Sequence, residues 1–223
     1  MLVTKHPDNE TLMAYATGAL TPGLCLAVSA HLHFCEECRD RYSALAAVGG
    51  DLLDATQPAE MSADALDLVL EKLDDAAVMR KPKRVSREQV LPEDEALLPE
   101  FITNLLPENG ARWKMLSPAL RVSRIPVGEE RYELALHKIK AGGKVPAHDH
   151  KGLEVTVVLQ GSFSDGDGIY HEGDFLVRKP GEQHRPTASQ NNSCICLSVS
   201  EAPIRLTGPI NRFMNPLFSV SPQ

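Results

Sequence analysis

The stretch HLHFCEECRDRY, residues 31–42, contains three side chains that bind soft metals: His31, Cys35 and Cys38. Their spacing, H-x3-C-x2-C, brings them to one side of a helix end and of the turn that follows it. Zinc prefers four nitrogen and sulfur ligands in a tetrahedron, and such a closed site contributes folding free energy directly. The stretch therefore predicts a structural zinc site that still lacks one ligand.

The fourth ligand has two candidates. His6 precedes the first expected helix and would tie that helix to the junction of the next two. His33 is the rival, but on a helix its side chain points away from that of His31. The alternatives to zinc are a thioredoxin-like redox pair, which needs a βαβ setting that this region lacks, and two unconnected thiols. We expect zinc to be bound by four residues: His6, His31, Cys35 and Cys38.

The surrounding residues follow a helical pattern with recognisable caps, such as Asp8 or Asn9 before the first helix and Thr21-Pro22 at the start of the second. Four helices are expected, over residues 6–20, 21–33, 36–55 and 62–79. The last one carries an apolar stripe at i, i+3, i+4 and i+7, formed by Leu66, Val69, Leu70 and Leu73. Short helices are marginal alone, so this unit needs a metal clip or a partner.

Charged residues are distributed unevenly along the chain. Residues 1–79 carry thirteen Asp or Glu and four Lys or Arg, a balance of −9, whereas RKPKRVSR at 80–87 carries five cations and no acid. The proline-rich and acidic stretch after this reversal is typical of a linker. We therefore expect a helical domain at 1–85, a linker at 86–100 and a second domain at 101–223. The net charge of −7 argues against general binding to nucleic acid.

The sequence also indicates a compartment. The first ten residues lack the apolar region of a secretory signal, and no apolar run reaches the length that crosses a bilayer. Five cysteines make an odd number, which favours a reducing environment over a set of disulfides. We expect a cytoplasmic protein.

Beyond residue 100 the pattern changes to short strands separated by Gly, Asp and Pro. In YELALHKIK, residues 132–140, Tyr132, Leu134 and Leu136 alternate onto one face. Many short strands of this kind predict a sandwich or a barrel. A second group of metal-binding side chains follows: His148, His150, Glu154 and His184. Such a set suits zinc, iron(II), manganese or nickel. His137 and His171 belong to no motif and are expected at the surface.

Two resemblances follow from these motifs. His6 with the H-x3-C-x2-C motif, in a small acidic helical domain, resembles the zinc-binding anti-sigma domain over about residues 5–80. The resemblance implies that this domain holds an extracytoplasmic-function-type sigma factor away from RNA polymerase. A strongly acidic surface suits a basic partner, and an apolar helical stripe suits a groove. The alternative for the stripe of the fourth helix is packing within its own domain.

The strand-rich half resembles the cupins, which implies a jelly-roll β-barrel. Residues 142–161 fit the first cupin motif throughout, whereas the second departs where Pro180 abuts Gly181 and Ala188 replaces a common Asn. The resemblance implies four metal ligands, expected to hold zinc or another divalent metal: His148, His150, Glu154 and His184. A metal-free cupin is the alternative. The sequence leaves open whether the cupin domains of two copies of the chain pair into a dimer.

The whole chain resembles the ChrR-type anti-sigma factors, which govern a response to singlet oxygen and related oxidants. The resemblance implies a two-domain α plus all-β protein, not an enzyme, whose cupin receives the signal. Cys194 and Cys196, two apart on an expected strand, are candidates for oxidation, or else simple core residues.

Two alternatives to an anti-sigma factor are open. One is an iron-dependent dioxygenase-like cupin enzyme with an accessory helical domain, in which Arg178 and Arg185 are candidates for binding a small acid. The other alternative is direct DNA binding by the four helices, which conflicts with their negative net charge.

Overall fold

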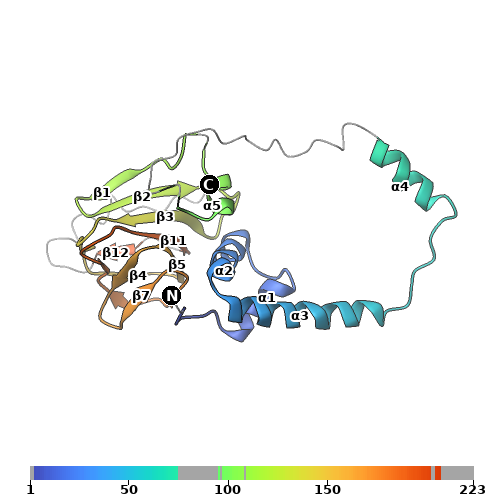
Figure 1. Cartoon of the computed structure of the whole chain (residues 1–223), viewed down its shortest axis with the longest axis horizontal. Helices are drawn as coiled ribbons and strands as arrows, with labels where there is room; N and C mark the ends of the chain where they lie inside the picture. The colour runs from blue at the N-terminus through green and yellow to red at the C-terminus, as the bar shows by residue number, and fades with distance from the viewer. Residues whose placement is uncertain (1–2, 75–94, 96, 108, 202–203, 207–223) are drawn as a thin grey trace.

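The computed structural model describes residues 3–74, 95, 97–107, 109–201 and 204–206. A helical region is followed by an all-β region (Figure 1). The helices are α1 (Asn9–Ala16), α2 (Pro22–Phe34), α3 (Glu36–Asp54), α4 (Ala65–Asp74) and α5 (Glu100–Leu105). The expected residues 75–79 of the fourth helix lie outside the described residues. No helix in the described part of the chain is long and apolar enough to cross a membrane.

Local chemistry explains where the first helices begin. The carboxylate of Asp8 accepts a hydrogen bond from the backbone N–H of Thr11 at 2.8 Å and so caps α1. Pro22 begins α2 at a position where its missing N–H costs nothing. Cys35 ends α2 and caps α3, whose first turn is acidic and therefore suits the positive end of the helix dipole.

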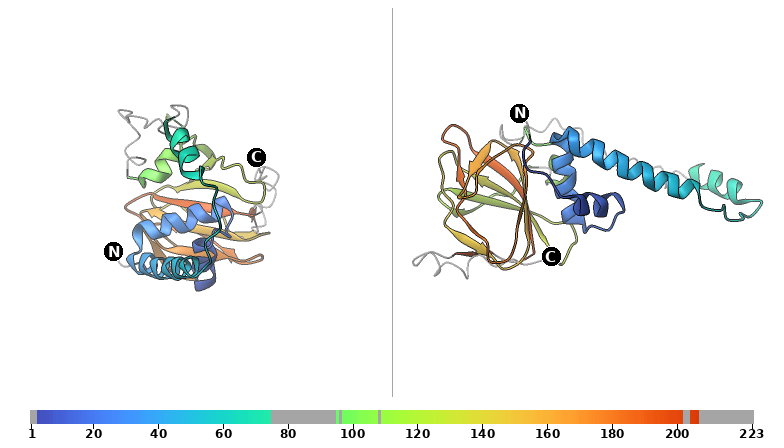
Figure 2. Two further views of the ribbon diagram at one scale, coloured as in Figure 1. Left: turned by 90° about the vertical axis from the view of Figure 1, so that its right-hand side faces the viewer. Right: turned by 90° about the horizontal axis from the view of Figure 1, so that it is seen from below.

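The all-β region contains three sheets. Their strands are β1 (Lys114–Ser117), β2 (Leu120–Ile125), β3 (Glu133–Ile139), β4 (His148–His150), β5 (Glu154–Gln160), β6 (Ser162–Ser164), β7 (Ile169–His171), β8 (Phe175–Arg178), β9 (Gln183–His184), β10 (Thr187–Ala188), β11 (Cys194–Ser200) and β12 (Ile204–Leu206). A six-stranded sheet has the order β1-β2-β3-β11-β5-β8, and two three-stranded sheets have the orders β10-β6-β7 and β12-β4-β9. Figure 2 shows the strands enclosing a barrel, with the helices outside it. The predicted combination of a helical region and a β-barrel is confirmed.

Strand β11 is buried on both of its faces. Ile195, Leu197 and Val199 pack in one core cluster with residues of α2 and α5. Cys194 and Cys196 point to the other side, into a second cluster inside the barrel. The helical region therefore shares a continuous core with the outer face of the six-stranded sheet.

The end of the expected linker is folded against the barrel. Glu95 is 1% exposed, and its carboxylate accepts hydrogen bonds from the indole N–H of Trp113 at 2.8 Å and from the backbone N–H of Ala111 at 3.0 Å. Leu98 is buried in the shared core. The domain boundaries at residues 85 and 100 stay predictions, since most of the expected linker lies outside the described residues.

Leu197→Ala is expected to lower the free energy of unfolding by about 2–5 kcal/mol, because Leu197 is fully buried and its truncation leaves a cavity in the shared core. Met115→Ala is the control, since Met115 is 71% exposed, and we expect a change within about 0.5 kcal/mol. Urea unfolding followed by circular dichroism measures both. Similar losses for the two variants would contradict the shared core.

Candidate metal centres

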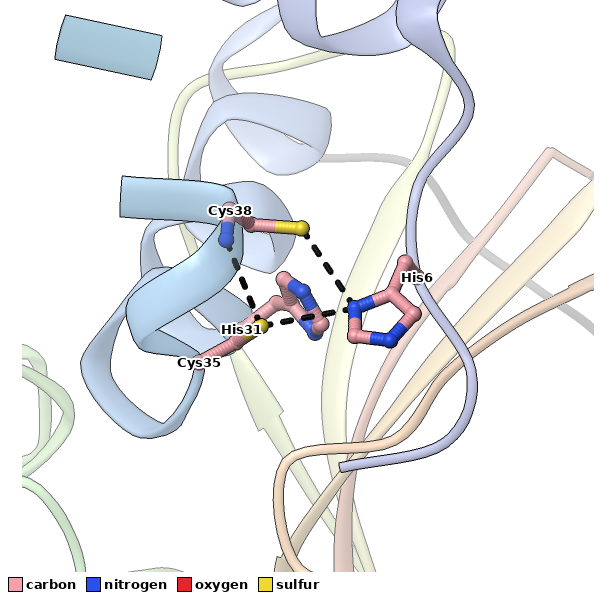
Figure 3. Close-up of side chains that lie close together, drawn as sticks. All are labelled: His6, His31, Cys35 and Cys38. Carbon is pink, nitrogen blue, oxygen red and sulfur yellow. Dashed lines mark hydrogen bonds between the residues drawn. The ribbon is translucent and has the colours of Figure 1, made fainter. Parts of the chain in front are cut away.

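The first candidate centre lies where α2 ends and α3 begins (Figure 3). His31 comes from the last turn of α2, Cys35 from the junction, Cys38 from the first turn of α3, and His6 from the segment before α1. Each of the four residues offers one nitrogen or sulfur atom to a metal, and these four atoms all lie within 4.8 Å of one another. The fold thus brings together all four of the residues that the sequence predicts for zinc.

The junction between the two helices positions the sulfur atoms. Cys35 has an extended backbone (φ −106°, ψ 106°), and its Sγ accepts a hydrogen bond from the backbone N–H of Cys38 at 3.4 Å. Nδ1 of His6 lies 3.4 Å from both sulfur atoms. His33, the rival ligand, is exposed, and its ring packs against Phe34 outside the cluster.

The ring nitrogens of His31 have different surroundings. Nδ1 lies 2.6 Å from the carbonyl oxygen of Gly173, so we assign the proton to Nδ1, which donates. Nε2 is buried and has no hydrogen-bond partner among the described residues. A buried lone pair without a donor is costly, and a cation would satisfy it.

Burial keeps the imidazole of His31 and the thiol of Cys38 uncharged. It lowers the pKa of His31, against the opposing effect of the hydrogen bond to Gly173. It also raises the pKa of the Cys38 thiol to about 11, with a further contribution from Cys35. Because a cysteine ligand must be deprotonated, a bound metal would displace a proton from Cys38.

The second candidate centre lies inside the barrel, on β4 and β9. His148 and His150 share one side of β4, and His148 is paired in register with His184 on β9. Nε2 of His184 lies 2.9 Å from Nε2 of His148 and 3.1 Å from Nε2 of His150. The three imidazoles therefore meet through their ring nitrogens.

The opposite nitrogens of two of these rings have acceptors. Nδ1 of His148 lies 2.9 Å from the carbonyl oxygen of Pro146, and Nδ1 of His184 lies 3.3 Å from Oδ2 of Asp165. We assign protons to both Nδ1 atoms, so both Nε2 atoms carry lone pairs. Burial lowers the pKa of His184 to about 4, with a further contribution from His148, and the ring stays neutral. Two lone pairs at 2.9 Å cannot bond to each other, and a cation between them would remove this conflict.

Glu154, the fourth predicted ligand, lies at the edge of this cluster. Its Oε2 is 3.3 Å from Nε2 of His150, while Oε1 accepts hydrogen bonds from Ser198 at 2.7 Å and Ser200 at 3.2 Å. Burial acts to raise the pKa of Glu154, but His150 and the other neighbours outweigh it, and the pKa lies below its ordinary value. The carboxylate is therefore negatively charged beside the histidines.

A cavity of about 50 Å³ adjoins the centre and has a largely apolar wall that includes Leu120, Ile139 and Phe163. His137 lines it too, which corrects the expectation of a surface position. The reason lies in the sheet: Leu134 and Leu136 of β3 face the helices, so the alternate side chains point into the barrel.

Asp165 is a part of the centre that no sequence motif marks. Its fully buried carboxylate accepts a hydrogen bond from Arg178 at 2.7 Å and orients His184. Arg178 also pairs with Asp167 at 2.9 Å. Arg178 is therefore occupied by two carboxylates, and Arg185 is exposed and does not line the cavity, which corrects their expected role in binding a small acid.

The candidate redox residues lie next to the cavity. The sulfur atoms of Cys194 and Cys196 are 3.6 Å apart, both residues are buried, and Cys196 reaches the cavity wall. The hydrogen bond to Cys194, followed by burial, raises the pKa of Cys196 well above its ordinary value. The Cys196 thiol is therefore neutral here, and the redox role of the pair stays a prediction.

The predicted partner-binding residues lie exposed on α4. Their exposed fractions are 67% for Leu66, 54% for Val69, 48% for Leu70 and 55% for Leu73. The second half of α3 exposes further apolar side chains that the sequence analysis does not mark: Val48, Leu52 and Leu53. Apolar groups gathered at the surface are typical of interaction sites.

Comparison with known proteins gives two family matches within this chain. A family model for a zinc finger matches residues 10–39, which include His31, Cys35 and Cys38. The model of the ChrR cupin-like domain matches residues 105–203, which include every candidate ligand in the barrel.

Two similar proteins cover nearly the whole chain. The anti-sigma-E factor ChrR of Cereibacter sphaeroides is 34% identical over 220 residues, which are 99% of this chain and 100% of that protein. The crystal structure of Rhodobacter sphaeroides SigE in complex with the anti-sigma ChrR contains a chain that matches with a TM-score of 0.73 and 32% identity. That match covers 89% of this chain and 99% of the other. The chain therefore belongs to the ChrR family of anti-sigma factors, as its motifs predict.

Proposed function

We propose that this chain is an anti-sigma factor that binds and inhibits an extracytoplasmic-function-type sigma factor. The observation that carries the proposal is its full-length similarity to ChrR, which is seen in a crystal structure in complex with SigE. The chain acts by binding rather than by catalysis, and it acts in the cytoplasm, where RNA polymerase works. The acidic residues of 1–79 complement a basic partner.

Helix α4 is the element that we propose to enter a groove of the sigma factor. Leu66, Val69, Leu70 and Leu73 share one side of the helix, because three to four residues make one turn. Leu68 lies on the opposite side. An amphipathic helix of this kind binds by burying its apolar side, while its charged side stays in water.

Leu70→Asp is expected to weaken sigma-factor binding at least about tenfold, because the helix would carry a charge into an apolar groove. Leu68→Asp is the matched control, since both leucines are 48% exposed on the same helix, and we expect its affinity to stay within about twofold. Titration calorimetry of the full-length chain with the purified sigma factor measures both. Equal effects of the two substitutions would overturn the assignment of this stripe.

We propose that the N-terminal cluster binds zinc through His6, His31, Cys35 and Cys38. Two imidazoles and two thiolates form a ligand set that suits tetrahedral zinc, and the unpartnered Nε2 of His31 supports the proposal. When bound, zinc would supply folding free energy to this small helical region. His6 would then fix the segment before α1 to the junction of α2 and α3.

Cys38→Ser is expected to abolish zinc binding at the N-terminal cluster, because the site loses one of its two thiolates. Cys25→Ser is the control: Cys25 is a half-buried cysteine of α2 outside the cluster, and its variant should keep zinc. Elemental analysis of protein purified without oxygen measures the zinc content of the chain, which should fall in Cys38→Ser by the share of this one site. Binding displaces thiol protons, so zinc affinity should fall as the pH is lowered. Unchanged zinc in Cys38→Ser, or an affinity independent of pH, would contradict the site.

We propose that the barrel cluster binds a divalent metal, with zinc as our first choice. Its proposed ligands are His148, His150, His184 and Glu154. The support is the convergence of three Nε2 atoms, two of them with lone pairs fixed by hydrogen bonds on the opposite nitrogen. Three histidines and one carboxylate also suit iron(II), manganese or nickel.

We propose that the barrel receives an oxidative signal, such as singlet oxygen, and that the signal releases the sigma factor. Cys196 lines the cavity beside the three histidines, and its sulfur lies 3.6 Å from that of Cys194. An oxidant that accepts two electrons, with loss of both thiol protons, would join these sulfur atoms as a disulfide. Both cysteines lie on β11, whose opposite face packs against the helices. A change on the inner face of β11 would therefore disturb the packing of the helical region.

His184→Gln is expected to lose the barrel metal, keep the N-terminal zinc, and no longer release the sigma factor when a photosensitiser generates singlet oxygen. The matched control is His137→Gln, which changes another cavity histidine outside the three-histidine cluster. Elemental analysis and a sigma-factor pull-down after illumination report the two effects. Retention of the barrel metal in His184→Gln would overturn the ligand set, and normal release without that metal would overturn its role in sensing.

A further inference from the structure

One turn of the barrel contacts both histidine-bearing segments of the N-terminal cluster. This turn, here named the β7–β8 turn, comprises residues 171–175. Figure 1 shows the segment from residue 3 onward passing near β7 before it enters α1. The turn bonds to His31 directly and to the segment immediately before His6.

The contact with His31 depends on Gly173. The carbonyl oxygen of Gly173 accepts the proton of His31 Nδ1 at 2.6 Å, and the ring of Phe175 packs edge-on against His31. Gly173 has a φ of +91°, and a Cβ atom there would lie 2.6 Å from Cβ of Phe34 and 2.7 Å from Cγ2 of Val3. Only glycine lets this carbonyl approach the end of α2 so closely.

The contact with the His6 segment depends on Asp174, which is fully buried. Its Oδ1 accepts hydrogen bonds from the backbone N–H groups of Thr4 at 2.7 Å and Lys5 at 2.9 Å. The backbone N–H of Phe175 donates to the carbonyl oxygen of Lys5 at 3.0 Å. Lys5, the residue directly before His6, is therefore held through both its backbone N–H and its carbonyl oxygen.

The same turn is bonded to the strands around the barrel cavity. The N–H of Gly173 donates to the carbonyl oxygen of Val158 at 2.8 Å, and the N–H of Val158 donates to the carbonyl oxygen of Asp174 at 3.2 Å. Val158 on β5 pairs with Cys196 on β11, which lines the cavity. The path from the cavity wall to His31 thus runs through a few consecutive contacts.

We propose that the β7–β8 turn is the outer shell of the N-terminal metal site and links it to the barrel. Asp174 is a positioning residue for His6, and the carbonyl of Gly173 sets the proton position on His31. The inference rests on the zinc site proposed above. Zinc affinity then depends on the contacts that this turn makes with His31 and Lys5, and zinc stabilises those contacts by the same factor.

Asp174→Asn in the full-length chain tests the proposal. The substitution keeps the shape of the side chain but removes the charge. Oδ1 of Asp174 accepts from Thr4 and Lys5, and Oδ2 accepts the backbone N–H of His171 at 2.8 Å, so the amide NH2 of an asparagine must face one of these donors. Metal affinity at the N-terminal site should fall about 10–100-fold. Cobalt(II) is the probe, because its thiolate charge-transfer absorption reports a site with cysteine ligands and not the proposed histidine and carboxylate site of the barrel.

Glu129→Gln is the matched control. Glu129 is another buried barrel carboxylate that bonds to the helical region, and it accepts the backbone N–H of Gly23 at 2.7 Å. Gly23 lies at the opposite end of α2 from His31. This variant should lose stability while keeping the cobalt affinity and spectrum of the wild type.

The outcomes separate the two proposals. A wild-type affinity and spectrum in Asp174→Asn would overturn the role of the turn and leave the zinc site standing. An equal loss of affinity in Glu129→Gln would also overturn it, because general loosening of the docked regions would then be the cause. A wild-type chain without thiolate-bound metal would overturn the zinc site itself, and the inference with it.

Discussion

Strand β11 is buried on both faces, and both hydrophobic cores of the molecule include its side chains. Its outer side chains, such as Leu197, share a core with α2 and α5, while Cys194 and Cys196 face the barrel interior. A strand with two apolar environments cannot shift toward one without disturbing the other, because close-packed interiors leave little free space. The cavity and the helical region are therefore mechanically joined through one strand.

The two candidate metal centres are built from different elements but orient their histidine rings in the same way. Burial lowers the pKa of His31, His148 and His184, and a hydrogen bond on Nδ1 of each of these rings turns Nε2 toward its centre. The first centre joins separate segments of the helical region, so a metal there would bear on folding. The second lies on neighbouring strands of a barrel that has its own core, so a metal there is free to serve as a receiver.

Different helices make different contacts in this molecule. Apolar side chains on α3 and α4 are exposed, and we propose that those on α4 meet the partner, whereas α2 packs against the barrel. The β7–β8 turn lies between these functions, because it contacts the β5 strand, His31 and the segment before His6. A signal at the cavity thus has a short route to the helices that would hold a sigma factor.

Local patterning predicts the first four helices to within a few residues, the convergence of His31, Cys35 and Cys38, and the shared strand face of His148 and His150, but it misses α5. Helical and strand periodicity set these relations within a few residues. Three features come from the tertiary fold: His137 faces the cavity, Arg178 pairs with Asp165, and Gly173 bonds to His31. These depend on which sheet face the helices cover and on contacts between residues far apart in the chain, which periodicity does not encode.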